Sequence, residues 1–218
     1  MQKAIAFDMD GVLINNQPLH YQIDMAVLKA CNHPATLEDV IIYTGQSNPD
    51  RWPKYKQTLE LTQSVDELID LQTQIMIDIF NQTPLTAIDG IPELLQWLNQ
   101  ENIPCAVASS SSHELIELVL TKCNIKEYFT HLVSGEDVKN GKPAPDIYLK
   151  AARIFNLPPA NCIAIEDSPA GMQSAKDAGF LCIGYVNPTT HGQEFSHAHH
   201  VITHFNQCQA IIKEYKPC

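Results

Sequence analysis

The sequence predicts an α/β protein with a doubly wound, mainly parallel sheet and an all-helical domain inserted after the first strand. From residue 87 onward, short apolar runs typical of buried parallel strands alternate with segments of helical periodicity. Between residues 16 and about 85, helical periodicity continues without an apolar run of the strand type. We therefore expect a core domain made of residues 1–15 and 87–218, and a helical cap domain made of residues 16–86.

The core is expected to follow the strand–helix alternation of a Rossmann-like fold, with right-handed crossovers between parallel strands. Ser111 and Glu114 have the spacing of a capping box ahead of one of its helices. Strands are predicted at residues 4–6, 105–108, 131–133, 162–165 and 181–183, with a last edge strand at 201–202. Helices are predicted after Gly90, at 114–120, 146–155 and 169–178, and at the carboxyl terminus.

Capping residues and stop signals define the helices of the cap. The first helix is expected to end at Asn32-His33-Pro34, because proline cannot continue it. Thr36 is the expected N-cap of a short helix that ends near Gly45. Ser64 and Glu67 form a capping box ahead of a longer helix.

Composition restricts the classes of partner. The 218 residues include 14 Lys and Arg against 25 Asp and Glu, a net charge of -11. This argues against a nucleic-acid or anionic-membrane partner, since phosphate contacts need basic patches, but it allows a small phosphate ester. We find no amino-terminal targeting pattern and no run of membrane-span length. The seven cysteines, an odd number without a C-x-x-C pair, suit reduced core residues of a cytoplasmic protein.

Two carboxylates follow the first predicted strand. Asp8 and Asp10 lie at its carboxyl end, where open α/β sheets bind ligands, and they point the same way if the backbone stays extended. Gly11 then permits a sharp turn. Two like charges so close favour a cation between them, and Mg²⁺ prefers oxygen ligands. The alternative for an isolated D-x-D-G is a strand that ends in an acidic turn.

Three further motifs follow in order along the core. Ser109-Ser110 comes after the second predicted strand, Gly141-Lys142-Pro143 lies in a loop, and Glu166-Asp167-Ser168-Pro169 follows a later strand. Together with the first motif, Asp8-Met9-Asp10-Gly11-Val12-Leu13, they cover nearly the whole chain. In this order the motifs resemble those of the haloacid dehalogenase superfamily, in particular the branch of β-phosphoglucomutases and small sugar phosphatases.

The resemblance implies phosphoryl transfer and gives roles to the acidic residues. Asp8 is expected to be the nucleophile that forms an aspartyl phosphate, and Asp10 the general acid and base. Mg²⁺ is the expected cofactor, held by Asp8, the backbone carbonyl of Asp10 and Asp167. Glu166 is expected to bind the ion through water or to steady Lys142. The acid at position 10 favours phosphate monoesters over dehalogenation or phosphonate cleavage, because members with those activities lack it.

The phosphoryl group is expected to contact Ser109, Ser110 and Lys142. The serines precede a helix N-terminus, which is a natural phosphate site, and the lysine can face the negative charge that develops on phosphorus. Each motif also has a simpler explanation. The serines can form a turn that caps the following helix, and the lysine can be a solvated loop residue. Asp167 and its neighbours can serve only to cap the helix that follows them.

Cap residues bear on the choice between a phosphatase and a mutase. His20 resembles a histidine found in β-phosphoglucomutases. The resemblance implies that His20 can hydrogen-bond to Asp10. Such mutases carry an arginine directly after the Gly-x-Ser of the cap, whereas here Asn48 occupies that position and the nearest arginine is Arg51. Without that cation the second phosphate of a bisphosphate is under-neutralised. We therefore favour a phosphatase that acts on a small sugar or polyol phosphate, with His20 and Asn48 as its cap residues for substrate.

Two alternatives stay open at this point: a β-phosphoglucomutase-type isomerase and, more remotely, a non-catalytic regulator that accepts phosphate on Asp8. The cap and Asp10 argue against the regulator, which needs neither a lid nor a leaving-group acid. The expected partner is a small phosphorylated metabolite, and the protein is expected to be a monomer or weak homodimer.

Two other features have more than one interpretation. The histidine-rich stretch from His191 to His204 suits a transition-metal site or, more simply, an exposed loop. Trp52 and Tyr55 can stack on a substrate or pack in the cap.

Overall fold

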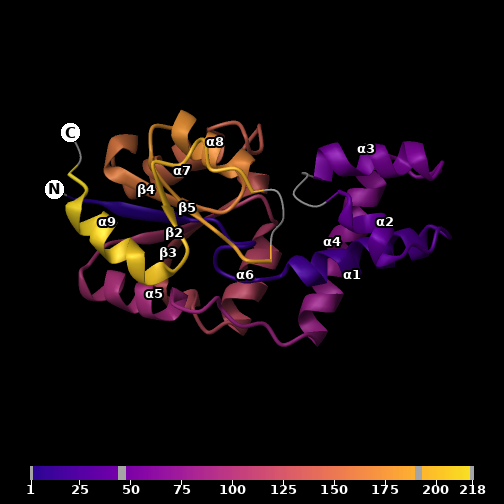
Figure 1. Cartoon of the computed structure of the whole chain (residues 1–218), viewed down its shortest axis with the longest axis horizontal. Helices are drawn as coiled ribbons and strands as arrows, with labels where there is room; N and C mark the ends of the chain where they lie inside the picture. The colour runs from indigo at the N-terminus through magenta and orange to yellow at the C-terminus, as the bar shows by residue number, and fades with distance from the viewer. Residues whose placement is uncertain (1, 44–47, 190–192, 217–218) are drawn as a thin grey trace. The chain divides into compact units, whose positions relative to one another are not determined.

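The computed structural model describes residues 2–43, 48–189 and 193–216, and it divides into two compact units (Figure 1). The first unit comprises the described parts of residues 1–15, 85–189 and 193–218. The second comprises the described parts of residues 16–84, whereas the expected cap extended to residue 86. Every strand assigned to the described residues belongs to the first unit.

A six-stranded sheet forms the centre of the first unit. Its order is β3-β2-β1-β4-β5-β6, and all neighbouring strands are parallel. The predicted α/β class with a doubly wound sheet is confirmed, and this sheet is wholly parallel rather than mainly so. The strands are β1 (Ala4–Phe7), β2 (Cys105–Ser109), β3 (Phe129–Ser134), β4 (Cys162–Glu166), β5 (Leu181–Tyr185) and β6 (His200–Ile202).

Helices cover both faces of this sheet. Helix α7 packs on β1, β2 and β3, and α8 packs on β4 and β5. In Figure 1 these two helices lie above the sheet, while α5 and α9 lie below it. The helices are α5 (Ile91–Gln100), α6 (His113–Lys122), α7 (Asp146–Phe155), α8 (Pro169–Asp177) and α9 (Cys208–Glu214), with short 3₁₀ turns at Lys126–Tyr128, Gly135–Asp137, Pro159–Asn161 and Phe205–Gln207.

Small side chains let α7 and α8 approach the sheet closely. Ala4 and Ala6 of β1 belong to the same buried cluster as Tyr148 of α7 and Met172 of α8. Because side chains alternate along a strand, the larger residues of β1 face the other helical layer. Close packing on the alanine face brings α7 within reach of the strand ends.

The strand order places β1 beside β4 at the middle of the sheet. From β1 the chain goes on to β2 on one side, and β4 lies on the other, so their carboxyl ends meet at a topological switch point. Phe7 is paired with Ile165, and therefore Asp8 and Glu166 follow at equivalent positions. This register sets the location of the site.

The second unit is a bundle of four helices among its described residues. They are α1 (Gln17–Ala30), α2 (Leu37–Ile41), α3 (Asn48–Thr58) and α4 (Val65–Gln82). Helix α1 packs on α2 and α4, and α3 packs on α4. The predicted capping box at the start of α4 is confirmed: the Glu67 N–H donates to Ser64 Oγ, and the Ser64 N–H donates to the Glu67 carboxylate.

Two expectations for this unit have definite outcomes. Helix α2 ends at Ile41, so the expected end near Gly45 is wrong, and Gly45 itself lies outside the described residues. A turn at residues 42–43 follows the helix at once. Trp52 and Tyr55 are buried, with 0% and 2% of their surface exposed, and pack in the core of this unit.

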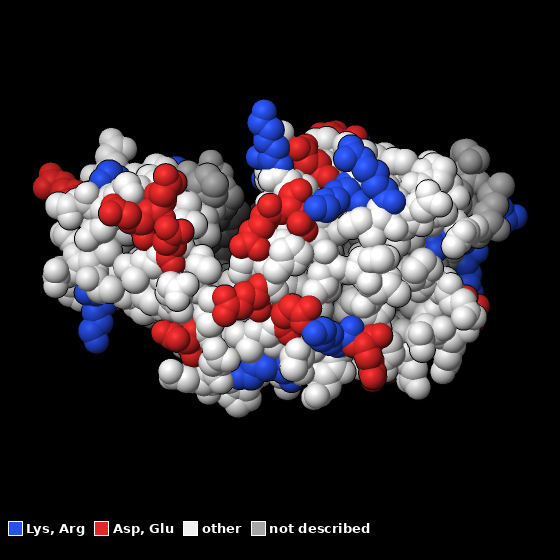
Figure 2. Space-filling view, turned by 180° about the vertical axis from the view of Figure 1, so that it is seen from behind, with Lys and Arg blue, Asp and Glu red and all other residues white. Residues whose placement is uncertain are grey.

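The surface is mixed in charge. On the face shown in Figure 2, acidic side chains form several small groups, and basic side chains lie between and beside them. In the part of the chain that the structure describes, no helix is both long and apolar enough to cross a membrane. Six cysteines lie in that part, all are free, and five of them are buried.

Candidate active site

The site begins where β1 ends. The Asp8 N–H donates to the carbonyl of Ile165 at 3.0 Å, which extends the pairing of β1 with β4 by one residue. The chain then turns at Gly11, which has a φ of +83°. A side chain here would be strained, and its Cβ would lie 2.2 Å from Asp167 Oδ2. Glycine is therefore required both by the turn and by the close approach of the β4 loop.

The loop after β4 supplies two more carboxylates. Glu166 is fully buried, and its Oε2 accepts hydrogen bonds from the Asp167 N–H at 3.2 Å and the Ser168 hydroxyl at 3.2 Å. Ser168 caps α8 by accepting the Gly171 N–H at 3.0 Å. A Cβ at Gly171 would lie 1.9 Å from Glu166 Oε1, so the glycine leaves room for this carboxylate.

Lys142 joins the two strand ends. Its Nζ lies 2.6 Å from Asp8 Oδ1 and 2.6 Å from Glu166 Oε1, and it donates to the Ala108 carbonyl at 2.9 Å. Only 7% of the lysine side chain is exposed. The residue therefore lies within the site and is not a solvated loop lysine.

Tyr148 completes the lysine's surroundings, and it was not among the predicted site residues. Its hydroxyl donates to Glu166 Oε1 at 2.7 Å, and Lys142 Nζ lies 5.2 Å from the centre of its ring. The periodicity of α7 contains a signal for this position. Tyr148 stands three residues before the small apolar residue Ala151, so the two share a helix face, and both are buried.

The electrostatics of the site are those of crowded acids. Burial raises the pKa of Asp8 to about 7 against the opposing effect of Lys142, with Glu166 and Asp10 raising it further. Burial also raises the pKa of Asp167 well above its usual range, and Asp8 and Glu166 add to that shift. For Lys142, burial alone would lower the pKa, but the two ion pairs raise it above the ordinary value. Lys142 is therefore protonated, while the acids lack sufficient positive charge.

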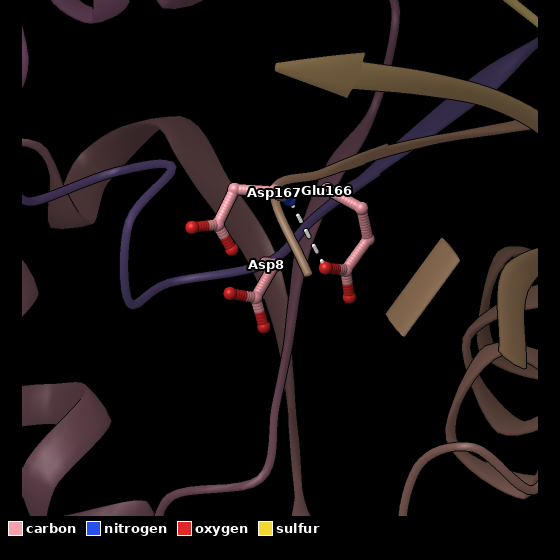
Figure 3. Close-up of side chains that lie close together, drawn as sticks. All are labelled: Asp8, Glu166 and Asp167. Carbon is pink, nitrogen blue, oxygen red and sulfur yellow. Dashed lines mark hydrogen bonds between the residues drawn. The ribbon is translucent and has the colours of Figure 1, made fainter. Parts of the chain in front are cut away.

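The donor set suits a hard divalent cation. Asp8, Glu166 and Asp167 each offer a carboxylate oxygen, and these oxygens lie within 4.8 Å of one another (Figure 3). Among the described residues this is the one group of three or more His, Cys, Asp or Glu side chains with such spacing. Lys142 contacts two of the three carboxylates. Oxygen ligands and excess negative charge are the features that Mg²⁺ sites share.

The side chain of Asp10 is directed elsewhere. Its Oδ2 accepts a hydrogen bond from Ser111 Oγ at 3.3 Å. The predicted capping box of Ser111 and Glu114 is therefore wrong: α6 is capped by Ser112, whose Oγ accepts the Leu115 N–H at 3.4 Å. Sequence spacing favoured the wrong serine, because Ser111 has a glutamate three residues further on, whereas the residue three after Ser112 is Leu115.

The two serines predicted to bind phosphate differ in exposure. Ser109 is the last residue of β2 and is fully buried, with its Oγ accepting the Ser111 N–H at 3.1 Å. Ser110 is exposed. Both lie at the carboxyl end of β2, the strand beside β1, and therefore at the same edge of the sheet as Asp8.

The remaining predicted residues, His20 and Asn48, belong to the helical unit. His20 lies on α1, near Asp24: burial raises the pKa of Asp24, and Arg51 and then His20 oppose that shift. Asn48 begins α3, and its Oδ1 accepts a hydrogen bond from Arg51 Nη2 at 2.7 Å. These contacts lie within the unit, and a role toward substrate stays a prediction for both.

In the histidine-rich stretch, the His204 N–H donates to Gln207 Oε1 at 3.0 Å, and His199 contacts a core strand. His199 Nδ1 accepts the N–H of Cys182 at 3.0 Å, and its own N–H donates to the Cys182 carbonyl at 2.8 Å. This ties the residue to β5. His191 lies outside the described residues.

Comparisons with known proteins agree with this geometry. Residues 5–185 match the family described as haloacid dehalogenase-like hydrolase. The chain belongs to this family. A phosphorylated carbohydrates phosphatase of Thermotoga maritima is 28% identical over 196 residues, covering 88% of each chain. The beta-phosphoglucomutase of Bacillus subtilis is 32% identical over 197 residues, covering 84% of this chain and 82% of the other.

A solved structure shows the same architecture. The crystal structure of CbbY from Rhodobacter sphaeroides in complex with phosphate has a TM-score of 0.79 at 25% identity, covering 94% of this chain and 95% of the other. The predicted resemblance to the haloacid dehalogenase superfamily and its β-phosphoglucomutase and sugar-phosphatase branch is confirmed. Membership of a hydrolase family makes this chain an enzyme, and the regulator alternative is wrong.

Proposed function

We propose that this enzyme is a Mg²⁺-dependent phosphatase that hydrolyses a small sugar or polyol phosphate through an aspartyl phosphate on Asp8. One observation carries the proposal. The Asp8 carboxylate lies at the switch point of the sheet, 2.6 Å from Lys142 Nζ and in one carboxylate cluster with Asp167. A nucleophile beside a fixed cation and a cation-binding carboxylate is the arrangement that phosphoryl transfer needs.

The ion would be held by Asp8, Asp167 and the backbone carbonyl of Asp10, with Glu166 binding through water or orienting Lys142. When bound, Mg²⁺ offsets negative charge near the phosphoryl group and orients its oxygens. The raised pKa values of Asp8 and Asp167 support this assignment, because a bound cation favours the charged form of each acid.

The reaction has two halves. In the first, a carboxylate oxygen of Asp8 attacks phosphorus, the ester P–O bond breaks, and Asp10 donates a proton to the departing alcohol oxygen. In the second, water attacks the same phosphorus, Asp10 accepts its proton, and inorganic phosphate leaves while Asp8 is regenerated. Throughout, the Lys142 ammonium group faces the phosphoryl oxygens, and the Ser109 and Ser110 segment supplies donors ahead of α6.

Hydrolysis is favoured over isomerisation by the charges of the helical unit. Arg51 is the one arginine of residues 16–84. It is buried, its Nη2 lies 3.4 Å from Asp24 Oδ1, and the same nitrogen donates to Asn48. A cation already paired in this way is less available to a second phosphate group. The Thermotoga maritima relative is named as a phosphatase of phosphorylated carbohydrates, which suits the same substrate class.

A mutase is the second candidate, because the Bacillus subtilis relative is named beta-phosphoglucomutase. A mutase must return phosphate to a sugar from Asp8 instead of to water. The two activities therefore differ in whether inorganic phosphate is released.

The deciding experiment is a panel of sugar, polyol and nucleoside monophosphates assayed for phosphate release, with Mg²⁺ and with EDTA. The panel includes β-glucose 1-phosphate with a trace of the 1,6-bisphosphate, assayed also for glucose 6-phosphate. We expect Mg²⁺-dependent phosphate release with one preferred ester. Isomerised sugar without net phosphate release would establish the mutase, and undiminished activity in EDTA would refute the metal requirement.

We infer further that the enzyme acts in the cytoplasm, from its cysteine pattern, as a monomer or weak homodimer on a small phosphorylated metabolite.

A further inference from the structure

Two amide side chains beyond β5 hold the loops that carry the acids. Asn187 is 2% exposed, and its Nδ2 donates to the Gly11 carbonyl at 3.0 Å, in the loop that follows Asp8. Gln193 Nε2 donates to the Asp167 carbonyl at 2.8 Å and lies 3.4 Å from Asp167 Oδ2. The loop after β1 and the loop after β4 are thus each bound to a residue that no sequence motif indicated.

The side-chain amide of Gln193 is also bound to the backbone of Asn187, which determines how Gln193 is oriented. Its Oε1 accepts the Asn187 N–H at 3.1 Å. Its Nε2 must therefore face Asp167, because a reversed amide would set an oxygen against two other oxygens and leave a nitrogen against an N–H. Gln193 is fixed at both ends of its side-chain amide.

Asp167 has little freedom in this environment. Gly11 lies against its carboxylate so closely that a Cβ there would be 2.2 Å from Oδ2. Lys142 forms its ion pairs with Asp8 and Glu166. Among the described residues, the side chain that donates a hydrogen bond to the Asp167 carboxylate is that of Gln193. The carboxylate is thus held by a glycine on one side and a neutral donor on another.

We propose that Gln193 is a positioning residue that holds the Asp167 carboxylate in the orientation needed to bind Mg²⁺. This rests on the metal site of the proposed function. A neutral amide is suited to the task, since it fixes one carboxylate oxygen without neutralising the negative charge that attracts the cation, as a lysine would. Groups that orient metal ligands in this way typically contribute about 10- to 100-fold to metal affinity.

The test is the Mg²⁺ dissociation constant of the metal-free, substrate-free protein, measured by titration calorimetry. Gln193→Met removes both polar ends of the amide at similar length, and we expect it to weaken Mg²⁺ binding about 10- to 100-fold. Gln193→Ala removes the same groups with less bulk and should give the same result if the methionine variant folds poorly. Gln100→Met is the matched control, because Gln100 is an exposed residue at the end of α5. Its Mg²⁺ affinity should equal that of the wild type.

A second readout separates positioning from a general structural role. In phosphate release, the Gln193 variants should need more Mg²⁺ for half-maximal rate, with kcat largely recovered at saturating Mg²⁺. A lower melting temperature with an unchanged Mg²⁺ dissociation constant would overturn the proposal, even if the wild type proves to be a phosphatase. Weakened Mg²⁺ binding in these variants would support it whatever the substrate turns out to be. Failure of the wild type to bind Mg²⁺ would overturn both this proposal and the metal site on which it rests.

Discussion

Each unit of this enzyme buries a cluster of charged and polar side chains, and the two clusters differ in charge balance. At the sheet edge, Asp8, Glu166 and Asp167 share one buried cation, Lys142. In the helical unit, Asp24 alone faces Arg51, at 3.4 Å. Burying a charged acid destabilises the fold unless a cation is paired with it. The first cluster has three acids for one cation and is short of positive charge, whereas the second has one acid and one cation.

In the helical unit, Asp24 accepts hydrogen bonds from two neutral side chains in addition to facing Arg51. Tyr55 Oη donates to Asp24 Oδ2 at 3.4 Å, and Gln72 Nε2 donates to Asp24 Oδ1 at 3.3 Å. Gln72 Oε1 in turn accepts the Trp52 indole N–H at 3.1 Å. These contacts join α1, α3 and α4, so the cluster stabilises the packing of the helices.

Charge balance, rather than burial or a shifted pKa, distinguishes the candidate active site from the structural cluster. Burial is the main cause of a raised pKa both for Asp8 at the sheet edge and for Asp24 in the helical unit. A shifted pKa alone therefore does not distinguish the two clusters. The surplus of carboxylates does, because a fold gains nothing by burying like charges together unless a ligand compensates them.

The largest expected effect comes from Asp8→Asn. Removing the proposed nucleophile should lower kcat by at least about a thousandfold. The free energy of unfolding of the metal-free protein should not fall, because the change removes one of the crowded charges. Steady-state phosphate release and urea unfolding measure the two quantities. Retained turnover would contradict the nucleophile assignment, and a large loss of stability would contradict the charge surplus.

Arg51→Met tests the balanced cluster. It should cost about 3–5 kcal/mol in the free energy of unfolding, since Asp24 is left as an uncompensated buried charge. Urea denaturation measures this cost. The double variant Asp24→Leu/Arg51→Met is the control, and it should recover much of the stability. A cost below about 1 kcal/mol, together with a raised KM for a bisphosphate, would instead indicate that Arg51 binds substrate, as the mutase alternative requires.

The surplus of acid also predicts a pH dependence. Because the pKa of Asp8 is raised to about 7, protons compete with Mg²⁺ below that pH, and affinity should fall by up to about tenfold per pH unit. Calorimetric titration at pH 8, 7 and 6 measures it. The free energy of unfolding of the Mg²⁺-free protein should change with pH in the opposite direction to the Mg²⁺ affinity. The folded protein takes up this proton near pH 7 and the unfolded chain only near pH 4, so stability should rise as pH falls from 8 to 6. Mg²⁺ affinity that does not vary with pH would contradict the raised pKa.

The smallest expected effect separates two adjacent serines. Ser111→Ala removes a hydrogen bond to Asp10 and should lower kcat/KM about 2- to 10-fold, corresponding to about 0.5–1.5 kcal/mol. Ser112→Ala is the matched control. It removes the cap of α6 and should lower the free energy of unfolding by about 1 kcal/mol with little effect on kcat/KM. The reverse pattern would restore the capping box first predicted for Ser111.

Local patterns in the sequence were sufficient to predict the strands, most helices and the motifs that carry the acidic residues and the lysine of the candidate site. Helix α7 begins at Asp146 and ends at Phe155, as periodicity predicted, and β1 and β4 lie where apolar runs marked them. Asp8, Lys142 and Asp167 were assigned to the site by the resemblance of four ordered motifs to the family, and each of their motifs lies at a local feature: a strand end, a stiff loop or a helix cap. These features depend on neighbours within a few residues, and a single sequence records them.

Tertiary structure alone decided which groups complete the site. Tyr148, Asn187 and Gln193 lie in ordinary segments and reach the acids through packing over long stretches of chain. No local pattern indicated that Arg51 would be paired with Asp24, or that Ser111 would turn toward Asp10 and leave Ser112 to cap the helix. Such partnerships depend on distances between residues far apart in the chain. Only the folded backbone sets those distances, because the sheet register and the packing of α7 and α8 on small residues bring these segments together.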